Sequence, residues 1–385
     1  MKKAYFIICL LILVFISSII HVTETVEGYQ DIFEKKVKNG VSQHSQQWLN
    51  QKIEHPVEGC SSFCLSNPIS CVFGTNCDYF SFTSGQLFVN KKDVVKTGLE
   101  TGTTGKRVEW KSKFGSLTFN FIGYQMAWGG MNEAGLVIST MNLPETKMPA
   151  PDERPPLNSG FWIQYQLDNH ATVEEVLASD SSVRIANTEK DHYLVCDKEG
   201  HCAVIEFLDG KMVYHTGRTL PVNVLTNSTY AESIDAWKKN KLYGDSLPRF
   251  ALAADEVGKK YTFASNKATI FYAFYILSLV SRPYTVWSIV FDNQELQVYF
   301  ISQRNQQMRR IDFEKLDFST KTPVRMLDVH APLEGDISDS LLPYSHQASL
   351  DHLKKSFQVF APGVQDDEIE ALLEFLENYP NTESM

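Results

Sequence analysis

The sequence has no surplus of positive charge, no long run of like charges, no low-complexity segment and no internal repeat. Its 36 lysines and arginines are outnumbered by 46 aspartates and glutamates, which gives the 385-residue chain a net charge of −10. Because contact with a phosphate backbone needs a basic surface, this balance argues against a nucleic acid as partner. Hydrophobic residues make up 43% and charged residues 21% of the chain, as in an ordinary folded protein with a large core.

Cysteines are few, and no two of them have the C-x-x-C spacing that is typical of zinc sites, so the sequence predicts no metal site. The seven cysteines are at positions 9, 60, 64, 71, 77, 196 and 202. Disulfides are allowed if the chain is exported. Cys196 and Cys202 flank a predicted hairpin turn, but whether they face each other depends on a strand register that the sequence leaves open.

The N-terminus has the pattern of an export signal. Lys2 and Lys3 precede an apolar stretch from Ala4 to Ile20, and no A-x-A cleavage pattern follows it. The stretch is long for the apolar part of a signal peptide and short for a membrane span. We therefore predict export with residues 1–22 as a signal peptide, and keep an uncleaved membrane anchor as the alternative. The polar residues 23–59 are predicted to be a propeptide or a linker.

After residue 60, short runs with a two-residue alternation of apolar and polar side chains predict β-hairpins. Two hairpins are predicted over 192–207 and 284–300, with a further strand over 212–214. A capping box over 172–175 predicts the start of a helix.

Residues 266–280 are nearly all apolar and predict a buried helix, because the stretch is short for a membrane span. The tail from residue 349 predicts two amphipathic helices separated at 361–363. Together these elements predict antiparallel sheets with helices packed outside them, an α+β arrangement.

Cys60 is the first candidate for a catalytic residue. Residues 60–65 and 72–79 predict two strands joined by a turn, and the returning strand would bring Asp78 beside Cys60. If the chain is cleaved before Cys60, the freed α-amine is a base with a pKa near neutrality, and Asp78 would hold it. Taken alone, however, a cysteine in an apolar strand is an inert core residue by default.

Five segments further along the chain favour the catalytic interpretation. On these segments, from Cys60 to about Phe318, the chain resembles the choloylglycine hydrolases, the penicillin V acylase and bile salt hydrolase group of N-terminal-nucleophile amidases. The resemblance implies an αββα four-layer sandwich over residues 60–320, and residues 321–385 are predicted to be a C-terminal helical extension. The segments, in order, are Phe73–Asp78, Gly130–Leu136, Leu225–Ser228, Pro248–Phe250 and Tyr284–Ser288.

The resemblance also implies roles for single residues. Cys60 would be the mature N-terminal nucleophile, and Asp78 would orient its amine. Asn142 and Asn227 would form the oxyanion hole, since neutral amide donors suit the developing negative charge. Arg249 would support the nucleophile end of the site. The implied reaction is hydrolysis of a small N-acyl amide, of the penicillin V or bile salt kind, through a thioester and without a metal or organic cofactor.

Thr75 departs from the family pattern. The bile salt and penicillin enzymes carry an arginine at this place, and a nearby positive charge would lower the pKa of a thiol. The substitution leaves the substrate class open. Aromatic residues near the predicted site suggest an apolar pocket for the acyl group; they are Phe80, Phe82 and Trp128.

Other interpretations stay open. A papain-like thiol hydrolase would need a histidine such as His192 or His215 beside the cysteine, although both are expected to be packing or surface residues on hairpin strands. Thr75 also leaves room for an exported binding protein of the same fold that has lost the reaction. Asn227 also begins an N-x-T glycosylation sequon, which competes with its place in an enclosed oxyanion hole.

Overall fold

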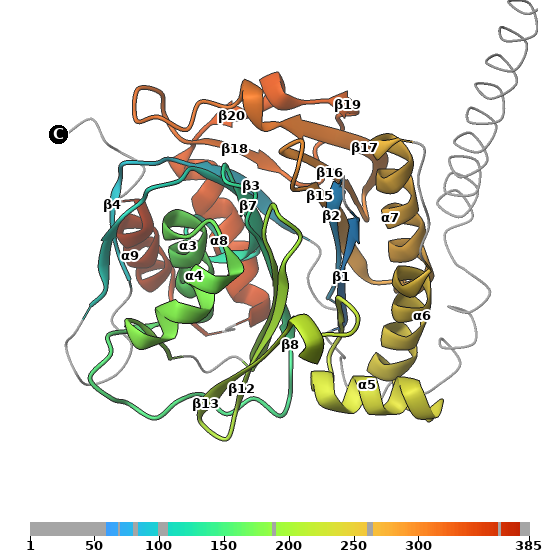
Figure 1. Cartoon of the computed structure of the whole chain (residues 1–385). Coiled ribbons are helices and arrows are strands. Elements are labelled where there is room, and N and C mark those ends of the chain that lie inside the picture. Colours follow the sequence, from blue (N-terminus) through green and yellow to red (C-terminus); the bar gives the residue numbers. More distant parts are fainter. Residues whose placement is uncertain are drawn as a thin grey trace, which may run out of the picture.

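The computed structural model describes residues 59–67, 70–79, 84–98, 107–186, 190–259, 265–360 and 363–377. Two sheets of mainly antiparallel strands face each other, and helices cover both outer faces (Figure 1). The predicted αββα sandwich is therefore confirmed. The predicted signal segment, residues 23–58, Phe80 and Phe82 lie outside the described residues.

The first sheet carries the predicted nucleophile. Its seven strands lie in the order β14-β1-β2-β15-β16-β17-β19, and all neighbours are antiparallel except β17 and β19. The predicted hairpins at 60–79 and 284–300 both lie in this sheet. The strands are β1 (Gly59–Asn67), β2 (Ser70–Asp78), β14 (Val224–Leu225), β15 (Thr285–Asp292), β16 (Gln297–Ser302), β17 (Asn305–Asp312) and β19 (Gly335–Asp336).

The second sheet has nine strands in the order β13-β12-β11-β8-β7-β6-β3-β18-β20. It contains the predicted hairpin at 192–207. Because β18 pairs with β3, this sheet continues past residue 320, the predicted end of the amidase domain. The strands are β3 (Gln86–Asn90), β6 (Ser116–Asn120), β7 (Ala127–Asn132), β8 (Val137–Asn142), β11 (Asp191–Cys196), β12 (Cys202–Leu208), β13 (Lys211–Thr216), β18 (Arg325–Asp328) and β20 (Leu342–Pro343).

Short elements complete the described part of the chain. Two small pairs of strands lie apart from the main sheets, β4 (Val95–Thr97) with β5 (Glu109–Lys111) and β9 (Pro156–Leu157) with β10 (Arg184–Ile185). Single 3-10 turns are η1 (Ser179–Ser181), η2 (Gly217–Thr219), η3 (Phe313–Lys315) and η4 (Ser338–Ser340).

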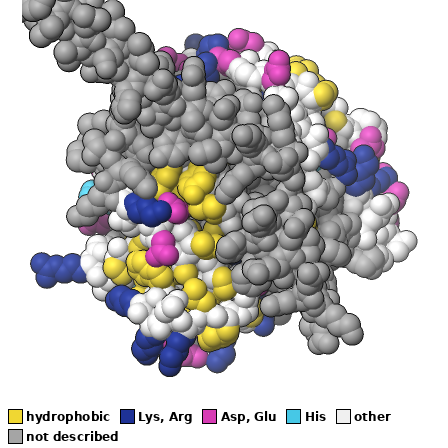
Figure 2. Space-filling view, turned by 90° about the vertical axis from the view of Figure 1, so that its right-hand side faces the viewer, with side chains coloured by type: hydrophobic (Ala, Val, Ile, Leu, Met, Phe, Trp, Pro, Cys, Tyr) yellow, Lys and Arg dark blue, Asp and Glu magenta, His cyan; other side chains and the backbone are white. Residues whose placement is uncertain are grey.

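Three helices cover the outer face of the first sheet: α5 (Tyr230–Lys239), α6 (Ser246–Gly258) and α7 (Asn266–Val280). The predicted bounds of α7 are confirmed, and its apolar composition is explained by its packing against both the sheet and the neighbouring α6. The hydroxyl of Ser265 caps α7 by accepting from the backbone N–H of Ala268. Figure 2 shows hydrophobic side chains gathered on the side of the molecule where these helices lie, with basic side chains along the lower edge.

The second sheet is covered by α3 (Ser159–Asn169), α4 (Val173–Ala178), α8 (His346–Phe360) and α9 (Asp366–Glu377). The predicted capping box at Thr172 and Glu175 begins α4. Both predicted C-terminal helices are present as α8 and α9. In α8, His352 Nε2 lies 2.6 Å from the carbonyl oxygen of Phe121, which ties this helix to the chain beside the second sheet.

The core lies between the two sheets and is rich in large apolar side chains from both. Close packing explains why one position of the Phe73–Asp78 segment, Gly74, is a glycine. A Cβ atom at Gly74 would lie 2.4 Å from the ring of Phe63 on the neighbouring strand, so a larger residue would displace that ring. The β1–β2 hairpin therefore depends on glycine for its packing as well as on its alternation of side chains.

Candidate active site

The β1–β2 register places the predicted nucleophile and its carboxylate side by side. Cys60 pairs with Cys77, and Gly59 pairs with Asp78. A Cβ atom built on Gly59 would lie 3.3 Å from Asp78 Oδ2 and 3.5 Å from Arg249 Nη2. The peptide bond between Gly59 and Cys60 is thus next to one carboxylate and one guanidinium group.

Asp78 is fully buried, and only one of its two carboxylate oxygens has a hydrogen-bond partner among the described residues. The hydroxyl of Thr285 donates to Oδ1 at 2.5 Å, whereas Oδ2 has no hydrogen-bond partner among the described residues. Burial raises the pKa of Asp78 from 3.8 to about 6, against the opposing effects of Arg249 and of the Thr285 hydrogen bond. On the side that faces Gly59, Oδ2 therefore has no hydrogen-bond donor among the described residues, although the Arg249 guanidinium group lies nearby.

Asn227 links Cys60 to the end of β8. Its Oδ1 accepts hydrogen bonds from the backbone N–H of Cys60 at 2.9 Å and from Arg249 Nη2 at 2.8 Å. Its Nδ2 donates to the backbone carbonyl of Asn142 at 2.8 Å. The side chain of Asn142 is half-buried at the end of β8. The structure therefore brings Cys60, Asn142, Asn227 and Arg249 into one connected group.

Arg249 is buried in the first turns of α6 and contacts the backbone of Cys60. Its Nη1 donates to the carbonyl oxygen of Cys60 and, at 2.8 Å, to the hydroxyl of Ser61. Its Nε and Nη2 donate to Asp245 Oδ2 at 3.1 and 2.9 Å. The guanidinium group is thus held in one orientation by four partners, with Asn227 as the fourth.

Asp245 was not among the residues predicted from the sequence. It binds both Arg249 and Arg282. Burial alone would raise the pKa of Asp245, but the two guanidinium groups outweigh it and lower the pKa below its ordinary value. The signal that could have indicated this residue is its spacing, since a carboxylate four residues before an arginine can pair with it across one helical turn.

The loop that carries Asn227 is anchored by a second buried group that the sequence did not predict. His192 Nε2 lies 2.7 Å from the carbonyl oxygen of Thr226, and His192 Nδ1 lies 3.3 Å from Glu206. Burial alone would raise the pKa of Glu206, but hydrogen bonds with His192 and His215 lower it to about 2. Glu206 also accepts from the backbone N–H of Tyr230 at 2.8 Å.

Both histidines of the papain-like alternative are therefore engaged elsewhere. His192 contacts Glu206 and Thr226, and His215 lies 3.7 Å from Glu206. These contacts position the Asn227 loop and provide no support for a Cys–His pair.

Thr75 lies between the two sheets in a group of three buried hydroxyls. Its Oγ1 is 2.8 Å from the hydroxyl of Ser62 and 3.0 Å from that of Ser139 on β8. Ser62 and Ser139 are 3.3 Å apart. The side chain at position 75 is satisfied without any charge, and the cation nearest to the nucleophile in the contacts described above is Arg249.

The Gly130–Leu136 segment has a structural role. Asn132 accepts from the backbone N–H groups of Ala134 and Leu136, both at 3.0 Å, and its Nδ2 donates to the carbonyl groups of Leu167 and His170. These bonds close the turn between β7 and β8 and tie it to the end of α3. The segment therefore sets where β8 runs, and Asn142 lies at the far end of that strand.

A group of cysteines is the one place in the described part of the chain whose geometry could suit a metal ion. The sulfur atoms of Cys64, Cys196 and Cys202 lie within 4.8 Å of one another. Cys196 and Cys202, whose register the sequence left open, are directly opposite each other and form a disulfide. Among the described residues, no helix is long and apolar enough to cross a membrane.

Comparison with known proteins gives matches that agree with this geometry. The family model of linear amide C–N hydrolases, choloylglycine hydrolase family, matches residues 60–241 and so starts at Cys60. Penicillin V acylase from Pectobacterium atrosepticum is 26% identical over 309 residues, which cover 66% of this chain and 80% of that protein.

Solved structures agree as well. Penicillin V acylase from Agrobacterium tumefaciens matches with a TM-score of 0.66 and 26% identity, over 74% of this chain and 98% of that one. A variant of conjugated bile acid hydrolase from Clostridium perfringens shares the fold, with a TM-score of 0.57, 16% identity, and coverage of 70% and 96%.

The fold is that of the N-terminal-nucleophile hydrolases, and the matches define the protein as an amidohydrolase that acts on linear amides. More narrowly, residues 60–241 match the choloylglycine hydrolase family of linear amide C–N hydrolases, the family that the sequence motifs resemble.

Proposed function

We propose that this protein hydrolyses an N-acyl amide through a thioester on Cys60, after removal of residues 1–59 has freed the α-amine of Cys60. The observation that carries the proposal is the state of Asp78. Its Oδ2 is buried, has no hydrogen-bond partner among the described residues and lies beside Gly59. Cleavage before Cys60 would create an ammonium group next to this oxygen, and an unpaired buried carboxylate is costly until it gains such a partner.

The reaction follows from the placement of these groups. The α-amine of Cys60 accepts the thiol proton while Sγ attacks the amide carbonyl, and the protonated amine then donates to the departing amine. An amide nitrogen has two N–H donors. One N–H of Asn227 is used by Asn142, which leaves the second for the oxyanion. Water then hydrolyses the thioester, with the α-amine again acting as base.

Arg249 contributes by position. It holds the carbonyl oxygen of Cys60 and the Oδ1 of Asn227, so that the nucleophile and the oxyanion donor keep a constant separation. A buried guanidinium held by four partners suffers little reorganisation during the reaction, which is the condition under which electrostatic stabilisation is most effective.

An apolar acyl group is the substrate feature that the packing supports. Trp287 on β15 pairs with Cys77, the residue opposite Cys60, and packs against Phe121 and Trp128. Aromatic rings next to the nucleophile would receive an apolar acyl chain better than a charged one. Penicillin V and a conjugated bile acid, the compounds in the names of the relatives, are the first substrates to assay.

We also propose that the chain is exported and that processing before Cys60 both activates the enzyme and releases it from the hydrophobic segment at 4–20. The basic and apolar N-terminus supports export. Fractionation of cells that produce the full chain, with antibody detection, tests this step. Active protein that still carries residues 4–20 would contradict it.

The enzymatic proposal is tested by the mass and activity of the recovered protein. We expect a mature chain that begins with Cys60, hydrolysis of an N-acyl amide, and covalent labelling of Cys60 by a thiol-directed ester analogue. Cys60→Ala should abolish both hydrolysis and labelling. Cys77→Ala is the matched control, because Cys77 is equally buried and directly opposite in the register.

An intact bond between Gly59 and Cys60 in fully active protein would exclude the mechanism. Correct processing without labelling of Cys60 and without hydrolysis of any amide would favour the alternative, a binding protein of the same fold.

A further inference from the structure

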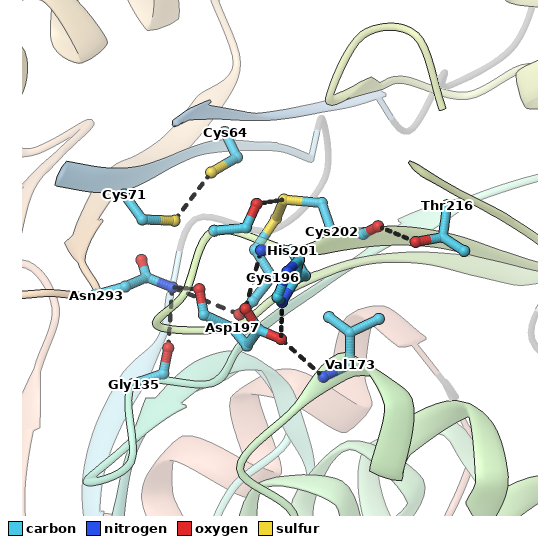
Figure 3. The surroundings of a disulfide bond; sticks show 11 residues. Cys64, Cys71, Gly135, Val173, Cys196, Asp197, His201, Cys202, Thr216 and Asn293 are labelled. Carbon is cyan, nitrogen blue, oxygen red and sulfur yellow. Dashed lines mark hydrogen bonds and ion pairs between the residues drawn. A yellow bond between two sulfur atoms is a disulfide. The ribbon is translucent and has the colours of Figure 1, made fainter. Parts of the chain in front are cut away.

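Four cysteines that the proposed reaction does not use meet at the other end of the β1–β2 hairpin (Figure 3). They come as two pairs from two different sheets: Cys196 and Cys202 are directly opposite in their register, whereas Cys64 and Cys71 are diagonal neighbours, opposite Phe73 and Ser66. Cys64 and Cys71 lie on β1 and β2, and Cys196 and Cys202 lie on β11 and β12. All four are buried, and Cys202 is the most exposed of them at 5%.

The sulfur atoms are close enough for their bonds to interchange. Cys64 Sγ and Cys71 Sγ are 3.2 Å apart, and a disulfide bond is about 2.05 Å long, so a small rotation of the side chains would join them. The sulfur of Cys64 is also within 4.8 Å of those of Cys196 and Cys202, which form a disulfide. The Cys64 thiol is therefore close both to the Cys71 thiol and to the Cys196–Cys202 disulfide.

The two hairpins are held together by contacts that involve the backbone. The backbone N–H of Asn293 donates to the carbonyl of Cys71 at 3.0 Å, and the Nδ2 of Asn293 donates to the carbonyl of Cys196 at 3.4 Å. The turn after β11 packs closely as well, since a Cβ atom at Gly200 would lie 2.5 Å from the hydroxyl of Ser66. The spacing of the four sulfur atoms is thus set by the fold.

We propose that these four cysteines form an internal thiol–disulfide exchange site, in which one disulfide moves between the β11–β12 hairpin and the β1–β2 hairpin. In the first step the thiolate of Cys64 attacks a sulfur of the Cys196–Cys202 disulfide. A mixed disulfide forms, the original bond breaks, and the leaving sulfur takes up a proton.

In the second step the thiolate of Cys71 attacks Cys64. The Cys64–Cys71 disulfide forms, the mixed disulfide breaks, and the second sulfur of the β11–β12 pair takes up a proton. Two protons move from Cys64 and Cys71 to Cys196 and Cys202, and no external oxidant is consumed.

The protonation of Cys64 keeps the exchange slow at neutral pH. Its hydrogen bond with Cys71, its burial and the negative charge of Asp197 raise the pKa of the Cys64 thiol well above its ordinary value. Because the thiolate is the attacking species, equilibration needs mildly alkaline conditions.

The exchange would change the hairpin that holds the active site. Cys60 and Cys64 are on the same face of β1, and Asp78 is on β2, so a Cys64–Cys71 disulfide crosslinks the two strands that carry the nucleophile and its carboxylate. When the disulfide is instead between Cys196 and Cys202, it crosslinks the β11–β12 hairpin. External thiols such as glutathione would act at Cys202, the most exposed of the four residues.

The test maps disulfides in the full-length protein as it is recovered from cells. The protein is equilibrated at mildly alkaline pH with mixtures of reduced and oxidised glutathione, quenched in acid, alkylated and digested with trypsin and chymotrypsin. Chymotrypsin cuts after Phe63, Leu65 and Phe73, and trypsin cuts after Lys198, so each of the four cysteines lies on a separate peptide. We expect species with a single disulfide to contain both pairings.

Removal of the second attacking thiol makes the test sharper. In Cys71→Ser the mixed disulfide between Cys64 and Cys196 or Cys202 should accumulate, from undetectable in the wild type to the main species with one disulfide. Cys77→Ser, a buried cysteine on the same hairpin, should leave the wild-type distribution unchanged.

Two results would overturn the proposal. One is that the Cys196–Cys202 pairing is the sole single disulfide at every glutathione ratio in the wild type, a result that does not depend on the folding of any variant. The other is that the reduced protein retains one zinc ion per chain after dialysis, which would make the four thiols a metal site instead.

Discussion

The β1–β2 hairpin carries a cysteine pair at each end, and the two ends differ in what other parts of the chain bring to them. At one end, Cys60 and Cys77 lie among charged and amide groups, with Asn227 and Arg249 bound to the backbone of Cys60. At the other end, Cys64 contacts Cys71 and lies within 4.8 Å of the sulfur atoms of the Cys196–Cys202 disulfide. All four sulfurs are buried, so burial alone does not distinguish a nucleophile from other cysteines; the donors supplied by neighbouring elements do.

The largest expected effect is at the polar end. Asn227→Ala removes the side-chain donor for the oxyanion, and we expect kcat to fall by about 10²–10³-fold, or about 2.7–4 kcal/mol of transition-state stabilisation. The control is Asn90→Ala, since the Asn90 side chain is also hydrogen-bonded but lies on β3 and contacts Ser116 and Thr118 instead of Cys60. It should lower stability and leave kcat unchanged. Equal losses of kcat in both variants would remove the distinction.

The second prediction concerns the two carboxylates of the polar end, the buried Asp78 and the half-buried Asp245. The pKa of Asp78 is raised from 3.8 to about 6, so in the uncleaved chain its ionisation opposes folding as the pH rises through this range. Asp78→Asn should therefore abolish hydrolysis yet stabilise the uncleaved chain at neutral pH by about 3 kcal/mol, with the gain vanishing below about pH 4. Urea titrations at several pH values measure the difference.

Asp245→Asn is the control, because it should change the stability at neutral pH in the opposite direction. The pKa of Asp245 is lowered by Arg249 and Arg282 despite burial, so its carboxylate contributes stability that is present above its unfolded pKa and is lost as the pH falls. This variant should be less stable at neutral pH, with a difference that shrinks in acid. A destabilised Asp78→Asn at neutral pH would contradict the unpaired state of Asp78.

The third prediction concerns the sulfur-rich end. Cys64→Ala removes a buried sulfur that contacts Cys71 but no group of the polar end, so we expect a loss of stability of about 1–2 kcal/mol and full hydrolytic activity of the mature enzyme. Thermal unfolding and steady-state kinetics on the same preparation measure both. Loss of activity without loss of stability would mean that the two ends are coupled.

The smallest effect is expected for a substitution at Thr75, which lies between the two ends of the hairpin. Thr75→Val keeps the shape of the side chain and removes the hydroxyl that bonds to Ser62 and Ser139, which still lie within reach of each other. We expect a loss of about 1 kcal/mol and unchanged kcat. Thr140→Val is the control, because the Thr140 hydroxyl has no hydrogen-bond partner among the described residues and its removal should cost less. A large fall in kcat for Thr75→Val alone would give Thr75 a part in catalysis.

Local patterns in the sequence were enough to predict the strands and helices that have a clear period. The alternation around Cys60 and Asp78 predicted the β1–β2 hairpin, and the apolar run at 266–280 predicted α7 with its observed bounds. The helix over 246–258, which carries Arg249, was not predicted. Pro248 fits there because it lies in the first turn, where its missing N–H has no partner within the helix.

The sequence by itself determined the class of fold and the pairing of Cys60 with a returning strand, because side-chain alternation and turn residues are local properties. The tertiary structure decided the rest. It joined Asn142, Asn227 and Arg249 to Cys60 and brought Asp245 and Glu206 to the same site. It also placed the Cys64 thiol near the Cys196–Cys202 disulfide. These contacts join segments far apart in the chain, and no local period encodes how the two sheets stack.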